Sequence, residues 1–179
     1  TPSSSTLKNP SVVYNSLGTF NVKLVTTNAY GIDSITKPNY MQVLNSFNLC
    51  STSSTTSQSG NLYDSGGPTG NYQNSENCNF LIDINCATSI TLSFSSFSTE
   101  SCCDHLYIYD GPNTSSPLLL NAYGTTIPSP VTANSGKMLL VFYTDGSITS
   151  SGYSATWSSF VPSGNPPIAN FTISDINPP

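Results

Sequence analysis

Residues 98–111 read STESCCDHLYIYDG and hold the densest group of charged and sulfur-containing side chains in the chain. Glu100, Asp104 and Asp110 lie there with the single histidine and two adjacent cysteines, although only 7% of all residues are charged. Acid, thiol and imidazole groups side by side suggest an active site at first, so each of them has to be placed on the fold.

The second half of this stretch has the pattern of a strand that ends in a turn. Leu106 and Ile108 alternate with polar and aromatic residues, which predicts one buried face, and Asp110 precedes a glycine in a turn signal. The same parity places His105 on the outer surface. A catalytic histidine needs a nucleophile and an orienting partner, and the many serines form no G-x-S-x-G motif. We therefore expect no enzymatic activity.

The same alternation recurs on both sides of the stretch. NFLIDIN (79–85) and SITLSFSSF (89–97) alternate apolar with polar residues, and GYSATWSSF (152–160) follows a Gly/Ser-rich turn. KMLLVFYTD (137–145) is apolar on both faces, as expected of a central strand. Many short strands at close spacing, with no convincing helical period, predict an all-β antiparallel sandwich.

The charge balance argues against two classes of partner. The net charge is −5, the four basic side chains are all lysines, and arginine is absent. Nucleic-acid recognition depends on clustered Lys and Arg, so we expect no nucleic-acid binding. No run approaches the roughly 20 apolar residues that cross a bilayer, so we expect no membrane insertion.

The chain has five cysteines, all between residues 50 and 103. They lack the C-x-x-C spacing of zinc sites, and a lone histidine cannot complete a Cys/His site. Disulfides formed in an oxidising compartment explain them better. We therefore expect a secreted protein at the cell surface or in the extracellular space, with one thiol left unassigned.

Residues 50–160 resemble a CUB domain, a β-sandwich interaction module of secreted and cell-surface proteins. The resemblance rests on four segments in the family's order: ITLSFSSFSTE (90–100), DHLYIYDGPNTSSPLL (104–119), YGTTIP (123–128) and MLLVFYTDGSITSSGYSATW (138–157). It implies a jelly-roll-like sandwich that binds proteins, or glycans as spermadhesin-type relatives do.

The resemblance implies a disulfide between Cys50 and Cys78. The family's second disulfide cannot form in the usual way, because a Tyr-Gly pair stands where relatives have Cys-Gly. Three pairings remain open: Cys86 with Cys102, Cys86 with Cys103, or a bridge between the adjacent Cys102 and Cys103. We expect Cys86 to tie the 98–111 loop to the sandwich.

Glu100, Asp104 and Asp145 align with the three carboxylates that coordinate calcium in a subset of CUB domains. The resemblance adds the backbone carbonyl of Ser147 as a further ligand, and Tyr72 as a residue that orients the carboxylates through hydrogen bonds. The chemistry is consistent, because Ca²⁺ takes about six to eight oxygen ligands. We expect Ca²⁺ here; the opposing interpretation is three solvated loop acids.

The segments on either side resemble parts of PKD domains, small immunoglobulin-like sandwiches, in an arrangement as in large secreted and surface proteins of bacteria. Residues 1–45 resemble the C-terminal half of such a domain through YNSLGTFNVKL (14–24), with a further strand expected at SVVY (11–14). Residues 161–179 hold a linker and the motif P-x-A-x-F-x-x-S (167–174), which resembles the first strand of a following PKD domain. Half a sandwich exposes an apolar face and unpaired edges, so we expect another segment to cover it.

The expected function is that of a non-enzymatic structural or adhesive module in a multidomain surface or filament-forming protein. A calcium-stabilised CUB domain would be its rigid part, and strand complementation between neighbouring chains or repeats would be its route to self-assembly. One alternative is an accessory binding or spacer region of a large secreted hydrolase. Another is a calcium-dependent receptor module for a protein or a glycan.

Overall fold

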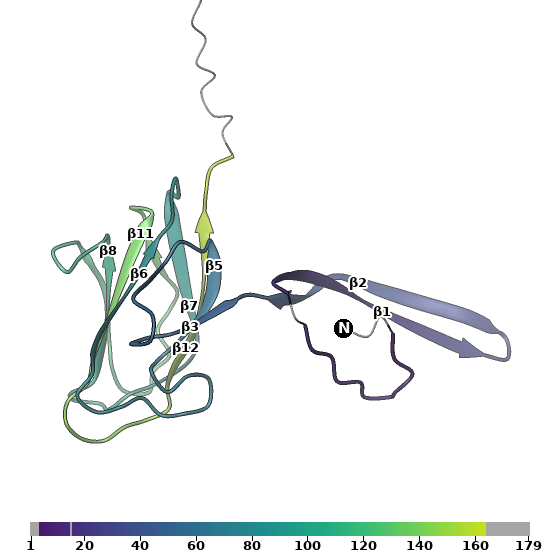
Figure 1. Ribbon diagram of the computed structural model, residues 1–179, viewed down its shortest axis with the longest axis horizontal. Helices are drawn as coiled ribbons and strands as arrows, with labels where there is room; N and C mark the ends of the chain where they lie inside the picture. The colour runs from purple at the N-terminus through teal and green to yellow at the C-terminus, as the bar shows by residue number, and fades with distance from the viewer. Residues whose placement is uncertain (1–3, 15, 164–179) are drawn as a thin grey trace, which may run out of the picture.

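The chain forms two β-sheets that pack face to face, with a two-stranded hairpin beside them (Figure 1). The computed structural model describes residues 4–14 and 16–163. The strands are β1 (Gly18–Asn28), β2 (Gly31–Val43), β3 (Asn45–Asn48), β4 (Ser54–Thr55), β5 (Ser59–Tyr63), β6 (Asn77–Asp83), β7 (Ser89–Ser98), β8 (His105–Asp110), β9 (Leu118–Ala122), β10 (Val131–Ala133), β11 (Lys137–Tyr143) and β12 (Gly152–Phe160). The predicted all-β sandwich is confirmed.

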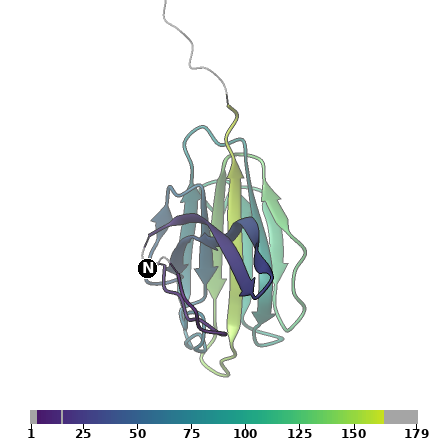
Figure 2. The same ribbon diagram turned by 90° about the vertical axis from the view of Figure 1, so that its right-hand side faces the viewer.

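Each sheet of the sandwich has five strands. One has the order β10-β7-β12-β5-β3 and the other β4-β6-β11-β8-β9. The pairs are antiparallel except at one edge of each sheet, where β3 runs parallel to β5 and β4 runs parallel to β6. In Figure 2 the hairpin lies in front and the strands of the sandwich run along a common direction behind it.

The alternation read from the sequence sets which side chains form the core. Leu106 and Ile108 of β8 are fully buried, and β11 is the central strand of its sheet, as predicted. The largest fully buried rings, those of Trp157, Tyr72 and Tyr153, come from β12 and the β5–β6 loop. These rings bury a large apolar area in the space between the two sheets.

Gly60 is required by the packing of the tryptophan. The residue pairs with Trp157 across β5 and β12, and a Cβ at position 60 would lie 2.1 Å from a ring atom of that side chain. Glycine is therefore the residue that lets the indole lie flat against β5. The indole N–H in turn donates to the carbonyl of Ser57 at 3.1 Å.

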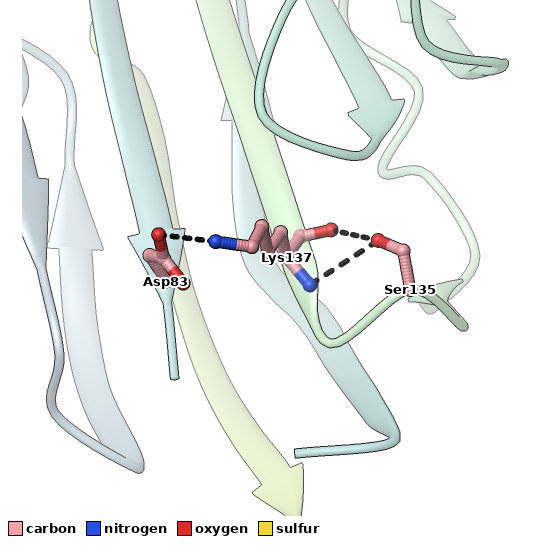
Figure 3. Close-up of polar contacts among 3 residues, drawn as sticks. All are labelled: Asp83, Ser135 and Lys137. Carbon is pink, nitrogen blue, oxygen red and sulfur yellow. Dashed lines mark hydrogen bonds and ion pairs between the residues drawn. The ribbon is translucent and has the colours of Figure 1, made fainter. Parts of the chain in front are cut away.

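The register of β6 and β11 is marked on the outer face by an ion pair (Figure 3). Lys137 lies opposite Asp83, and its Nζ is 2.6 Å from the Asp83 Oδ2. Ser135 brackets the same lysine, accepting from its backbone N–H and donating to its carbonyl. Both charged side chains are about 40% exposed (42% and 38%), so this pair contributes little stability.

In the first part of the chain, the observed strands differ from the expected ones. Residues 11–14 form no strand, and residues 45–48, for which no strand was expected, form β3 at the edge of the first sheet. β1 and β2 form an antiparallel hairpin that pairs with no other described strand. Residues 164–179, where the first strand of a following domain was expected, lie outside the described residues.

The disulfides correct one expectation. Cys50 is bonded to Cys78, as the family resemblance implies. Cys102 is bonded to its neighbour Cys103, and Cys86 is an exposed free thiol. The expected bridge from Cys86 to the 98–111 loop is therefore wrong, because the two cysteines of that loop satisfy each other.

The described residues also bear on membrane insertion. Within residues 4–14 and 16–163 we find no helix with the length and hydropathy needed to cross a bilayer.

Candidate metal centre

Three carboxylates from two loops meet at one end of the sandwich. β7 ends at Ser98 opposite Gly152, where β12 begins, and β11 ends at Tyr143 opposite His105, where β8 begins. The β7–β8 and β11–β12 loops therefore leave the same end of the sandwich. They bring one carboxylate oxygen each of Glu100, Asp104 and Asp145 to within 4.8 Å of one another.

Asp104 is the buried member of the cluster. Its side chain is fully buried, with Oδ2 accepting from the Tyr72 hydroxyl at 2.5 Å and Oδ1 accepting from the Asp145 backbone N–H at 2.9 Å. The Thr99 hydroxyl donates to the Asp104 carbonyl at 3.1 Å. These bonds hold the carboxylate and its backbone in one position.

Tyr72 connects two of the acids. Its hydroxyl donates to Asp104 and accepts from the Glu100 backbone N–H at 3.0 Å. Its ring is fully buried and meets Phe142 edge-on, with the ring centroids 5.2 Å apart. Burial and the bond to Asp104 raise the pKa of Tyr72 to about 12, so the phenol keeps its proton and remains a donor. The Tyr72 hydroxyl thus links the Asp104 carboxylate to the backbone of Glu100.

Glu100 has an oxygen with no partner. Its Oε2 is buried and makes no hydrogen bond to any described residue. Burial raises the pKa of Glu100, and the negative charges of Asp145 and Asp104 raise it further. An unpartnered buried carboxylate oxygen costs free energy, and a cation bound here would offset that cost.

Asp145 is held through its backbone as well as its side chain. Its carbonyl accepts from the Ser75 N–H, and its Oδ1 accepts from the Ser147 N–H at 2.9 Å. Ser147 is exposed in the loop that follows. The next residue, Ile148, has a φ of 55°, a conformation that is rare for a β-branched side chain. The loop therefore reverses sharply beside Asp145.

The residues present fit calcium. Three carboxylates and nearby loop carbonyls are hard oxygen donors, which suit Ca²⁺ rather than a soft-ligand metal. No lysine neutralises the cluster, because the ion pair found among the described residues joins Lys137 to Asp83. Glu100 also lies near Cys102 and Cys103, but their sulfurs are joined in a disulfide and provide no thiolate ligand.

His105 lies on the outer face, as its parity predicts. Its Nδ1 is 2.7 Å from the Asn121 Oδ1 and its Nε2 is 3.2 Å from the Cys102 carbonyl. The ring stacks on Tyr107 with centroids 5.5 Å apart. Both ring nitrogens are thus engaged with an amide and a backbone carbonyl.

Asp110 and Asp64, two further acids near strand ends, have structural roles. Asp110 accepts from the backbone N–H groups of Asn134 and Ser135 at 3.1 and 2.8 Å. Asp64 is fully buried and accepts from the N–H groups of Gly66 and Tyr153, each at 2.8 Å. Both carboxylates thus bind backbone N–H groups, and Asp110 precedes a bend, as its sequence context suggested.

Two threonines that support the centre were not anticipated from the sequence. The Thr99 hydroxyl joins the β7–β8 loop to Gly124, whose N–H donates to it at 3.0 Å. The Thr144 hydroxyl accepts from the Glu76 N–H and donates to the Gln73 carbonyl, each at 2.8 Å. The available signal was that each threonine directly precedes a predicted ligand, Glu100 or Asp145. In a chain so rich in Ser and Thr, that position does not single out Thr99 or Thr144.

Comparison with known proteins agrees with this fold. The CUB domain profile matches residues 50–157. Multiple epidermal growth factor-like domains protein 8 of Rattus norvegicus is 38% identical over 89 residues, covering 49% of this chain and 3% of that protein. Cubilin of Canis lupus familiaris is 36% identical over 109 residues, which are 59% of this chain and 3% of cubilin. The chain thus spans a small fraction of these relatives.

Solved CUB structures share the sandwich. The MASP-1 CUB2 domain bound to Ca²⁺ superposes with a TM-score of 0.54 at 23% identity, over 61% of this chain and 99% of that domain. The CUB1-EGF-CUB2 region of human MASP-1/3 gives a TM-score of 0.55, again at 23% identity, over 62% of this chain and 43% of that region. With a family match over more than half of its length and the sandwich to support it, this chain belongs to the CUB domain family.

Proposed function

We propose that this chain is a non-enzymatic extracellular binding module whose CUB domain is locked by one calcium ion. Glu100, Asp104, Asp145 and the backbone carbonyl of Ser147 would hold the ion, and Tyr72 would orient the acids. The observation that carries the proposal is the buried, unpartnered Oε2 of Glu100 beside two further carboxylates. A structural relative, the MASP-1 CUB2 domain, is described as bound to Ca²⁺.

The ion would act on the loops rather than on a substrate. The β7–β8 and β11–β12 loops each bring acids to the same point, so their mutual repulsion would be replaced by attraction to one cation. The loops at this end of the sandwich would then form a rigid surface, which is what a protein-binding module needs to keep the entropy cost of association low.

We propose further that the module belongs to a structural or adhesive surface protein or filament. Support comes from the hairpin, which is separated from β3 by Leu44 alone and carries exposed apolar residues. Residues 1–45, which include the hairpin, resemble the C-terminal half of a PKD domain, and residues 161–179 resemble a linker and the first strand of another. An accessory region of a secreted hydrolase would have the same modules beside a catalytic domain, so the sequence that flanks the chain separates these two possibilities.

A specific observation favours a receptor role as the second candidate. Tyr123 is 51% exposed and Tyr143 47%, and the Tyr123 ring lies 4.8 Å from the ring of His105, just beside the carboxylate loops. Exposed rings of this kind suit protein contacts and sugar stacking. Binding to a protein or glycan panel that is lost on adding a chelator would support this role.

The test of the calcium centre is a titration of the chelator-treated full chain with CaCl2 in a calorimeter. We expect one ion per chain, and a rise in melting temperature when calcium is added, because the ion binds only the folded state. Asp145→Asn should abolish both effects. Asp83→Asn, which removes a carboxylate that is paired with Lys137, is the matched control and should bind as the parent does. Absence of heat with the parent chain, or unchanged binding by Asp145→Asn, would refute the proposal.

A further inference from the structure

The β1–β2 hairpin has an apolar face that no described segment of the chain covers. Leu24 and Ile35 lie opposite each other in the register and are 60% and 59% exposed. Val22, on the same face of β1, is 37% exposed. A hairpin of two strands is marginally stable in water, and a third strand or a packing partner is normally needed. The length of β1 and β2, 11 and 13 residues, makes this requirement stronger.

The two faces of the hairpin are not equivalent. Phe20 pairs with Met41 on the face that carries Leu24 and Ile35, and the ring of Tyr14 packs on Phe20 with centroids 4.6 Å apart. The opposite face carries pairs such as Lys23 with Thr36 and Val25 with Ser34. The first face also carries Lys37 opposite Val22, with its Nζ 4.9 Å from the centroid of the Tyr40 ring. A partner that adds its own apolar side chains would use this face along β1, where Val22 and Leu24 are exposed.

The two free edges also differ. β2 contains Pro38, which has no N–H to donate, and its register with β1 shifts around Asn39, whose φ is 52°. β1 contains no proline and offers 11 residues without a break. An incoming strand finds its continuous row of backbone donors and acceptors along the outer edge of β1.

Residues 164–179 of the chain have the complementary pattern. Their sequence, GNPPIANFTISDINPP, places Ala169, Phe171 and Ile173 at alternate positions, so that as a strand they would share one face. No charged residue precedes Asp175 in this segment. The strand would thus bring an apolar row of three side chains to the uncovered row of the hairpin.

The place where this segment leaves the sandwich decides which hairpin it can reach. Asn45 pairs with Gly60, which also pairs with Trp157 near the end of β12. The hairpin base and the chain exit therefore lie at the same end of the sandwich. Antiparallel pairing with β1 has to begin at the hairpin tip, and reaching the tip from the base takes about 37 Å, or roughly 11 residues at 3.4 Å each. Ile168 lies only five residues after Ser163, a span of about 17 Å, so a strand that begins there cannot start at the tip of its own hairpin.

We propose that residues 168–174 of a second copy of this chain, which follow Pro166 and Pro167, add as a third strand to the outer edge of β1, antiparallel to it. Ala169, Phe171 and Ile173 of that copy cover Val22 and Leu24. Each copy then donates one strand and accepts one, a head-to-tail contact that gives a ring if it closes and a filament if it does not. This inference rests on the structural role proposed above and names the partner of the hairpin.

The test uses the full chain and two pairs of variants, with assembly followed by light scattering on a sizing column and by electron microscopy. Leu24→Asp puts a charge on the covered face, and Val25→Asp puts the same charge on the other face at a similarly exposed position, 60% against 52%. Leu24→Asp and Phe171→Asp should lower the association constant by about tenfold or more, since a charge would be buried without a partner. Val25→Asp and Thr172→Asp should stay within about twofold of the parent, because these side chains remain in water.

A synthetic peptide of residues 164–179 supplies the second readout. Added in excess to the assembled parent chain, it should occupy the hairpins and shorten the assemblies, and a Phe171→Asp peptide should not. A parent chain that remains monomeric, including one that binds its own segment, would overturn the proposal, as would equal effects of Leu24→Asp and Val25→Asp. Calcium titration of the same variants keeps the two proposals apart: normal calcium binding without assembly would refute only this one.

Discussion

At the scale of single residues, Glu100 and Asp104 show how one loop gives two carboxylates different roles. Asp104 is buried and has both oxygens hydrogen-bonded, so its position is set without a metal. Glu100 keeps one buried oxygen without a partner. The cluster is thus preorganised at Asp104 and electrostatically unfavourable at Glu100. A cation bound to the fixed Asp104 carboxylate would also give the free oxygen of Glu100 a partner.

Glu100→Gln should therefore have effects of opposite sign with and without calcium. In chelator, we expect the variant to melt at a higher temperature than the parent, because one of three mutually repelling charges is gone. With saturating calcium, we expect it to melt lower, and its calcium affinity to fall by about tenfold or more, because ligand charge sets the affinity. Differential scanning calorimetry in both buffers measures this. A variant that melts lower in both buffers would contradict the electrostatic explanation.

Tyr72→Phe tests the hydrogen bonds that position the acids. The variant removes the donor to Asp104 and the acceptor for the Glu100 N–H, both at buried positions. We expect a loss of about 2–3 kcal/mol in the free energy of unfolding and a calcium affinity about 10–100-fold lower. Tyr143→Phe, at a 47% exposed ring, is the control and should change neither quantity.

At the scale of strands and loops, the alternation of apolar and polar residues predicted which side chains of a strand face the core, because that depends on one strand alone. Leu106 and Ile108 face the core and His105 faces outward, as the period of two requires. β3 could not be read in this way, because it is four residues long and is held by parallel pairing with β5. The pairing of Cys102 with Cys103 likewise depended on the loop conformation and not on spacing. The acids of the candidate site were identified through the resemblance to calcium-binding CUB domains, and alternation alone would not have singled them out.

Asp110 joins two elements and gives a prediction that depends on pH. Burial raises the pKa of Asp110, but the bonds from Asn134 and Ser135 lower it by more, so the pKa lies below its ordinary value of 3.8. A carboxyl with a lowered pKa in the folded state stabilises the fold above its ordinary value, and this contribution is lost as the pH falls through the lowered value.

Asp110→Asn should therefore cost about 1–2 kcal/mol at pH 7, where the charged acceptor is lost. The difference between parent and variant should shrink steadily below pH 3.8. Urea unfolding at pH 7 and pH 3 measures both differences. Asp33→Asn, at an exposed position of the hairpin, is the control. A cost that is the same at both pH values would show that Asp110 acts through shape alone.

At the scale of the whole molecule, the sandwich separates the two proposed sites. The carboxylate loops lie where β12 begins, and the hairpin base lies near where β12 ends. Calcium and a strand from a second copy would therefore act on opposite ends of one rigid body. The Cys50–Cys78 disulfide contributes to that rigidity, because Cys50 follows β3 of one sheet and Cys78 lies in β6 of the other.

The two disulfides should differ in what their removal does. Cys50 and Cys78 are 28 residues apart, and closing a loop of that length stabilises the fold by about 3–4 kcal/mol in the chain-entropy relation. Cys102 and Cys103 are adjacent, and the same relation gives about 1 kcal/mol. Cys50→Ser/Cys78→Ser should thus lower the free energy of unfolding in chelator and in calcium alike. Cys102→Ser/Cys103→Ser should have a small effect in chelator and a larger one in calcium, because this bridge lies in the loop between Glu100 and Asp104. Urea unfolding of both double variants in the two buffers measures these four values. If both variants lose the same stability in chelator, the Cys50–Cys78 bridge does not act on the fold and the Cys102–Cys103 bridge on the calcium loop in the way expected here.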